Sequence, residues 1–198
     1  EVFVPAGSSV SVEGFQATIS VAGVTGSVSA ETVNGSITQS GAAKGVELQS
    51  VNGAIDVTKA SGRLKAEAVN GAVTVRDASG ELEASTVNGK LQVTGGSFER
   101  VTLESVAGGV RFEGGLSAKA TLSVETVSAP VELFLPAGLG AEFSVSTFSG
   151  AITNDLGPAA EKSSRFTPEK ELTFTTGAGG ARITVETLSG AVSIHKKP

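Results

Sequence analysis

Apolar and polar residues alternate along nearly the whole chain, in pairs of short runs that recur every 18 to 21 residues. The period-two alternation holds on both sides of a short break, which predicts two half-buried β-strands in every repeat. We therefore expect an all-β fold whose strands share one aliphatic core. Two of the apolar columns are Val28, Val46, Leu64, Leu82, Val101, Leu122, Phe143 and Ile183, and Ile37, Ile55, Val73, Leu91, Val110, Val131, Ile152 and Val192.

The break between the two runs reads Val-Asn-Gly in four copies, each 18 residues after the last. These begin at Val33, Val51, Val69 and Val87, and weaker copies follow at Val106, Val127, Phe148 and Leu188. Asn-Gly between alternating runs also suits a β-hairpin, so a meander or an up-and-down barrel is the rival architecture. The residue before each Val is always small or hydroxylated, and such columns favour a solenoid, where equivalent residues stack.

The sequence thus predicts one β-solenoid domain over residues 1–198, with about ten turns and two main strands per turn. The crossover rule favours a right-handed coil. Residues 1–9 are expected to form an N-terminal cap or first strand, residues 155–171 an irregular excursion, and residues 182–198 the last turn. A damaged ninth turn would place Pro168 at the Val position, and Lys196, Lys197 and Pro198 would blunt the final edge.

Each residue of Val-Asn-Gly has an expected role at its corner. The Val is predicted to enter the core, and the Gly to permit the bend. The stacked Asn side chains are predicted to form an amide ladder. The predicted corner residues are Asn34, Asn52, Asn70 and Asn88, with Gly35, Gly53, Gly71 and Gly89.

Three stretches carry a resemblance to a known family: the serial Val-Asn-Gly corners, residues 133–138 (LFLPAG) and residues 177–194 (GAGGARITVETLSGAVSI). Over nearly its whole length the chain resembles a bacterial β-strand-repeat family that is labelled adhesin-like and has a domain of unknown function. The resemblance implies a β-helix domain in an extracytoplasmic setting, next to a signal peptide, lipid anchor or membrane segment. It carries over no catalytic residues. The chain begins with Glu1, not Met, so a mature or trimmed fragment is expected.

Composition narrows the function classes. The 198 residues carry a net charge of −5, and only 18% are charged, which argues against a nucleic-acid partner. Cys is absent, so neither a disulfide framework nor a Cys-based metal site can form. No apolar run approaches the roughly 20 residues of a membrane-spanning helix.

Residues able to carry catalysis are few and scattered. The single histidine, His195, is predicted to be an outward, solvated side chain near the C-terminus. The three aspartates, Asp56, Asp77 and Asp155, occupy different columns, which gives little support to a lyase-like carboxylate cluster. No nucleophile elbow, phosphate-binding loop or zinc-protease motif is present. The sequence predicts no enzyme, cofactor or metal.

One outward column is acidic in most repeats and lies two residues before the Val. Its acidic members are Glu31, Glu67, Glu104, Glu125 and Glu186, with Gln49, Ser85 and Ser146 interspersed. Such a column is either a solvated sheet face that discourages edge aggregation or a docking face for a basic partner or a divalent cation.

These patterns predict a non-enzymatic structural or interaction module of the bacterial cell envelope, adhesin-like in character. Its partner would be an envelope protein or glycan. A surface-glycan binder or polysaccharide-lyase-like protein is the first alternative, for which Phe134 and Phe166 are the only candidate exposed aromatics. A scaffold that self-associates through a flat sheet face or a rod end is the second.

Overall fold

The computed structural model describes residues 1–158, 161–162 and 169–197, and this part of the chain contains strands and no helix. The strands of the first seven turns are β1 (Val10–Gly14), β2 (Ile19–Ala22), β3 (Ser27–Thr32), β4 (Ile37–Ser40), β5 (Gly45–Ser50), β6 (Ile55–Thr58), β7 (Ser61–Ala68), β8 (Val73–Arg76), β9 (Ser79–Thr86), β10 (Leu91–Ser105), β11 (Val110–Thr126) and β12 (Val131–Pro136). The strands that follow are β13 (Ala141–Thr147), β14 (Ile152–Asn154), β15 (Glu161–Lys162), β16 (Lys170–Thr176), β17 (Ala181–Thr187) and β18 (Val192–Lys197).

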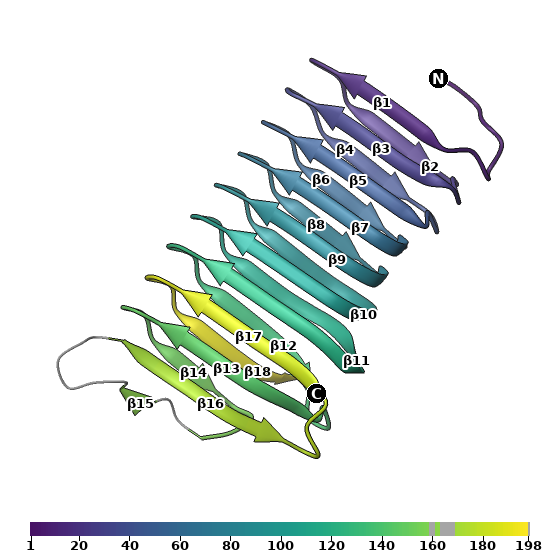
Figure 1. Ribbon diagram of the computed structural model, residues 1–198. Helices are drawn as coiled ribbons and strands as arrows, with labels where there is room; N and C mark the ends of the chain where they lie inside the picture. The colour runs from purple at the N-terminus through teal and green to yellow at the C-terminus, as the bar shows by residue number, and fades with distance from the viewer. Residues whose placement is uncertain (159–160, 163–168, 198) are drawn as a thin grey trace.

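Parallel strands stack into a rod with two sheet faces, so the predicted β-solenoid is confirmed (Figure 1). The register follows the sequence columns: Val28 lies beside Val46, and Ile37 lies beside Ile55. Odd-numbered strands β1 to β9 form one face, and β2 to β8 form the other. Each turn has a second corner, opposite the Val-Asn-Gly corner. β10 and β11 run through this second corner without a break, so each of them contributes to both faces.

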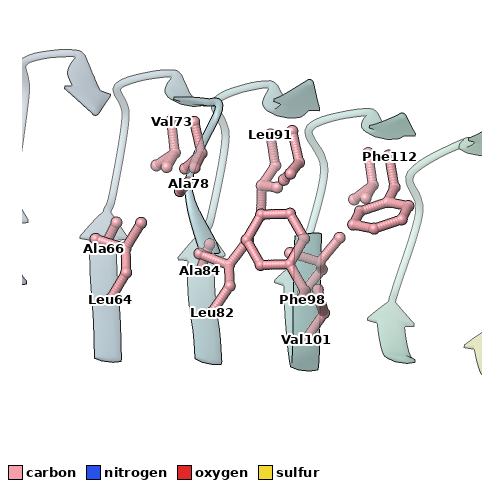
Figure 2. Packing of buried hydrophobic residues seen from close by; sticks show 14 of the residues in the cluster. Leu64, Ala66, Val73, Ala78, Leu82, Ala84, Leu91, Phe98, Val101 and Phe112 are labelled. Atoms are coloured by element: carbon pink, nitrogen blue, oxygen red, sulfur yellow. The ribbon is translucent and has the colours of Figure 1, made fainter. Parts of the chain in front are cut away.

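The inward side chains of both faces form one core along the rod. Leu64, Leu82 and Val101 stack on one face, and Val73 and Leu91 stack on the other (Figure 2). Their side chains are at most 3% exposed. In the longer turns, Phe98 and Phe112 fill the added interior, with ring centroids 6.1 Å apart.

The stacking order departs from the chain order after β12. The last strands, β17 and β18, lie between the turn of β11 and β12 and the turn of β13 and β14 (Figure 1, yellow). Ile183 thus lies between Leu122 on one side and Phe143 on the other. The prediction that residues 182–198 end the rod is therefore wrong: this segment is last in sequence but not in space.

The far end is closed by β16, which pairs antiparallel with β13, and β15 pairs antiparallel with β16. Leu172 and Phe174 therefore belong to an antiparallel closing strand and not to a ninth parallel turn, while Pro168 lies outside the described residues. Lys196 and Lys197 lie on β18, so they do not blunt the end. The count of ten turns is not confirmed, and the right-handed sense stays a prediction.

At the other end, the first strand begins at Val10, after the segment predicted to be a cap. The Ala6 carbonyl accepts hydrogen bonds from both the backbone N–H and the hydroxyl of Thr25, at 2.7 and 3.1 Å. These bonds attach the N-terminal segment to the corner between β2 and β3.

We call the turn formed by β17 and β18 the inserted turn. Its position in the stack can be tested with engineered cysteines, because the chain has no cysteine of its own. Glu125 and Glu186 are direct neighbours across β11 and β17, so their Cα atoms are about 5 Å apart, within disulfide range. Ser146 lies one strand further on, about 10 Å from Glu125. We expect Glu125→Cys with Glu186→Cys to form a disulfide on mild oxidation, detected by non-reducing peptide mapping. The pair Glu125→Cys with Ser146→Cys serves as control; crosslinking of that pair alone would mean that the turns stack in chain order.

Candidate functional site: a groove along the Val-Asn-Gly corner

The residue before each Val, and not the Val itself, turns into the rod at this corner. Thr86 is 4% exposed, and its hydroxyl donates to the carbonyl of Gly71 in the previous turn at 3.2 Å. The same hydroxyl accepts the backbone N–H of Gly89 at 3.0 Å. Ser50 makes the equivalent two bonds two corners earlier, and Ala68 takes the position between them. Each hydroxyl therefore ties its corner to the one before it.

The Val side chains lie on the surface, so the prediction that they enter the core is wrong. Val51, Val69 and Val87 are 38–40% exposed, and Val106 and Val127 are 43–44% exposed. The inward position is taken by the preceding residue, and in an extended chain the next side chain points the opposite way. The outcome is an exposed apolar row along the rod, which we call the corner row: Phe15, Val33, Val51, Val69, Val87, Val106, Val127, Leu188 and Phe148 in spatial order.

The predicted Asn ladder is present. Asn52 donates from Nδ2 to Oδ1 of Asn34 at 2.7 Å, and Asn70 and Asn88 continue the chain of amide bonds at 2.8 Å. All four side chains are exposed to solvent. The ladder is therefore a surface feature that links four successive corners.

Asn70→Ala is expected to lower the free energy of unfolding by about 1 to 2 kcal/mol, because Asn70 both donates to Asn52 and accepts from Asn88. Asn34→Ala removes only the end of the ladder and should cost about half as much. Urea unfolding of the two variants measures both values. Equal midpoints for Asn70→Ala and the unmodified chain would show that the ladder adds nothing to stability.

The inserted turn brings three glutamates of the acidic column onto adjacent strands. In sequence, Ser146 follows Glu125, but in space Glu186 takes that place, so Glu104, Glu125 and Glu186 stand on three adjacent strands. All three side chains are exposed, and within the described part of the chain none of them is in an ion pair. Carboxylates about 5 Å apart repel one another, and a cationic ligand would relieve that repulsion.

Elsewhere the column does not form a run of adjacent carboxylates. The Glu67 carboxylate pairs with the ammonium of Lys65 at 3.1 Å, and the hydrogen bond to Glu67 raises the pKa of Lys65 above its ordinary value. Glu31 is exposed, but its neighbour in the column on the next turn is Gln49. We call the three adjacent carboxylates Glu104, Glu125 and Glu186 the unbalanced part of the column.

A groove with a volume of about 610 Å³ runs between this unbalanced part and the corner row. One wall is formed by Glu104, Glu125 and Glu186, and the other by apolar side chains. The buried column of small and hydroxylated residues lies between the walls. The apolar wall consists of Val87, Val106, Val127, Leu188 and Phe148, of which Leu188 and Phe148 are at least half exposed. The groove thus offers negative charge and apolar surface side by side.

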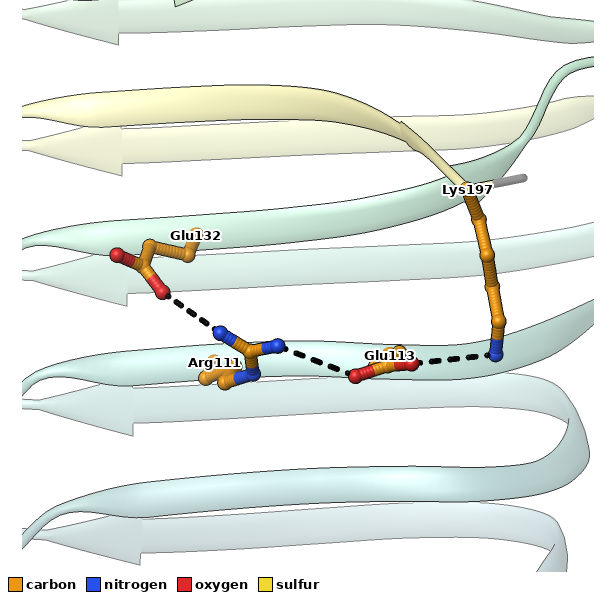
Figure 3. Close-up of polar contacts among 4 residues, drawn as sticks. All are labelled: Arg111, Glu113, Glu132 and Lys197. Atoms are coloured by element: carbon orange, nitrogen blue, oxygen red, sulfur yellow. Dashed lines mark hydrogen bonds and ion pairs between the residues drawn. The ribbon is translucent and has the colours of Figure 1, made fainter.

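The opposite sheet face carries a compact set of ion pairs. Arg111 bridges Glu113 at 3.2 Å and Glu132 at 3.3 Å, and Lys197 approaches Glu113 at 3.5 Å (Figure 3). The hydrogen bond from Arg111, with a smaller effect of Lys197, holds the pKa of Glu113 below its ordinary value. Because Lys197 lies on β18 and Glu113 on β11, their ion pair spans the intervening strand β12.

His195 and Phe134 belong to the same face and both have partners. His195 points outward as predicted, but it is half-buried, and its Nδ1 lies 3.0 Å from Oδ2 of Asp155. Its ring packs against Phe134 with centroids 5.0 Å apart, and the Arg111 guanidinium lies 4.1 Å above the same phenyl ring. His195 is therefore outward and partly solvated, as predicted, and in addition it connects β18 to both adjacent turns.

The groove and its solenoid can now be compared with known proteins. The Toastrack DUF4097 family model matches residues 18–195. The chain belongs to this Toastrack family. The match supports a β-repeat domain of unknown function and carries no indication of adhesion. No curated protein and no solved structure matches the chain.

Among the described residues, no group of three or more His, Asp or Glu side chains is arranged to hold a metal ion. In the same residues no helix is long and apolar enough to cross a membrane.

Proposed function

We propose that this Toastrack domain is a non-enzymatic interaction module that recognises its partner through the corner groove. The observation that carries the proposal is the exposed apolar wall beside three carboxylates that have no ion-pair partner among the described residues. Contiguous exposed apolar side chains mark interaction surfaces more often than chance, whereas isolated ones do not. An adhesin-like role in the bacterial cell envelope, outside the cytoplasm, fits the family resemblance and belongs to the same proposal.

The aromatics predicted for the glycan-binding alternative do not support it. Stacking of a sugar needs an open aromatic face, and Phe134 has His195 packed against it and Arg111 above it. The prediction that Phe134 and Phe166 are the only exposed aromatics is wrong, because Phe3, Phe15 and Phe148 are at least half exposed and Phe148 lines the groove. Phe166 lies outside the described residues. Self-association through the closed end of the rod is opposed on one sheet face, where β16 covers the edge of β13. On the other face the outer edge of β14 has no partner strand among the described residues.

The proposal is tested by panning a phage-displayed library of random peptides against the immobilised domain. We expect enrichment on the unmodified domain and its loss on the triple variant Val106→Ser, Val127→Ser and Leu188→Ser. A matched control, Val51→Ser with Val69→Ser, alters the same corner row outside the groove at similar exposure. Enrichment that survives the groove variant, or that the control abolishes as well, would overturn the proposal.

A further inference from the structure

We propose that the occupant of the groove is an extended polypeptide segment of another protein, in which basic and apolar residues alternate. The inference rests on the proposed function and names the class of partner for the same site. It is drawn from three properties of the groove: its width, its length and the opposed chemistry of its walls.

The width of the groove favours an extended chain over a helix. Glu104 on one wall and Val106 on the other are two residues apart along the chain, so their Cα rows are only about 7 Å apart. An α-helix with its side chains is about 10 Å across or more. The apolar wall of the groove crosses five strands, or about 19 Å. A trough of this width and length suits a single extended chain.

The length of the groove sets the size of the segment. At about 3.3 Å per residue, an extended chain of about six residues covers the five strands. The groove ends at Phe148 and Glu169, beside the closing strand β16. A short linear segment is therefore sufficient.

The walls select alternating chemistry. Successive side chains of an extended chain point in opposite directions, so one set would face the carboxylates and the other the apolar wall. Residues on the same side of such a chain are about 6.7 Å apart, while the three carboxylates extend over about 10 Å. Two lysines on one side would therefore each lie between two neighbouring carboxylates. Valine or leucine on the other side would contact Val106, Val127 and Leu188.

The experiment uses the whole domain and synthetic peptides labelled with fluorescein, with binding followed by fluorescence anisotropy. The probe is an acetylated Lys-Val-Lys-Val-Lys-Val peptide. The comparison peptide has the same composition with three lysines followed by three valines. We expect the alternating peptide to bind about tenfold more tightly than the blocked one, and to weaken as salt is raised.

Glu104→Gln, Glu125→Gln and Glu186→Gln together should weaken binding of the alternating peptide about tenfold or more. The control triple Glu13→Gln, Glu31→Gln and Glu47→Gln removes the same charge from exposed positions outside the groove and should leave binding unchanged. Melting temperatures of both triples check that the fold is intact.

Each remaining outcome contradicts the inference. Equal affinity for the two peptides would mean that charge alone is recognised, and so would equal competition by spermine, which has the charge without the apolar side chains. Equal loss in both triple variants would place the peptide outside the groove. If other library peptides still require Val106, Val127 and Leu188, the proposed function stands and only the alternating partner is wrong. If no peptide requires them, both fail.

Discussion

Gly71→Ala is expected to lower the free energy of unfolding by about 4 kcal/mol or more. A Cβ atom built on Gly71 would lie less than 3.0 Å from the carbonyl oxygen of Gly53 in the previous turn. That oxygen belongs to the backbone and cannot move aside like the end of a flexible side chain. The neighbouring turns would have to separate at this corner, which would also break the Asn70 and Thr86 bonds.

Gly138→Ala is the matched control, because nothing lies within 4 Å of its added Cβ and its φ is not positive. Thermal and urea unfolding of both variants measure the difference. A cost for Gly71→Ala no greater than for Gly138→Ala would show that the turns are not as closely packed as the structure indicates.

The reason for glycine at this corner differs from the predicted one. None of Gly35, Gly53, Gly71 and Gly89 has a positive φ, so the bend itself does not require glycine. Close stacking does: each corner carbonyl points at the α-carbon of the next corner. The repeat therefore identified the corners that carry glycine, while Ala17 and Ala129 take the same position in two others. The reason for glycine depends on the distance between turns, which no single repeat contains.

The exposure of the corner row could have been read from the alternation. Val28, Ala30 and Thr32 share one parity and all point inward. Val33 is out of phase with them and so points outward. The prediction placed the Val in the core because its side chain is apolar, although the parity of its position points it outward. One wall of the groove was missed for that reason.

The inserted turn could not be predicted from the columns. Phe143 and Ile183 both fit on Leu122, and Val145 and Val185 are identical residues at one position of the repeat. Columns of this kind fix the register of each turn but carry no information on the order of turns. The antiparallel direction of β16 was hidden for a similar reason, since period-two alternation reads the same in both directions.

Ile183→Asp is expected to unfold the end of the rod selectively. Ile183 is fully buried between Leu122 and Phe143, so an aspartate there would place an unpaired carboxylate in the core, at a cost of several kcal/mol. The solenoid is stabilised mainly by contacts between neighbouring turns, so the damage should spread to β13, which rests on β17, and to β16, which rests on β13. The turns from β1 to β9 have no contact with the inserted turn and should stay folded.

Hydrogen exchange followed by mass spectrometry separates these segments. We expect amides of β13, β16 and β17 to lose protection, while amides of β3, β5 and β7 keep it. Thr184→Asp, at the adjacent outward position, is the control and should change neither set. If the turns stacked in chain order, β13 would instead rest on β11 and keep its protection in Ile183→Asp. Glu186 and Leu188 belong to the inserted turn and line the groove. Ile183→Asp should therefore also abolish groove-dependent peptide binding. Hydrogen exchange and peptide binding together test whether the inserted turn completes the site.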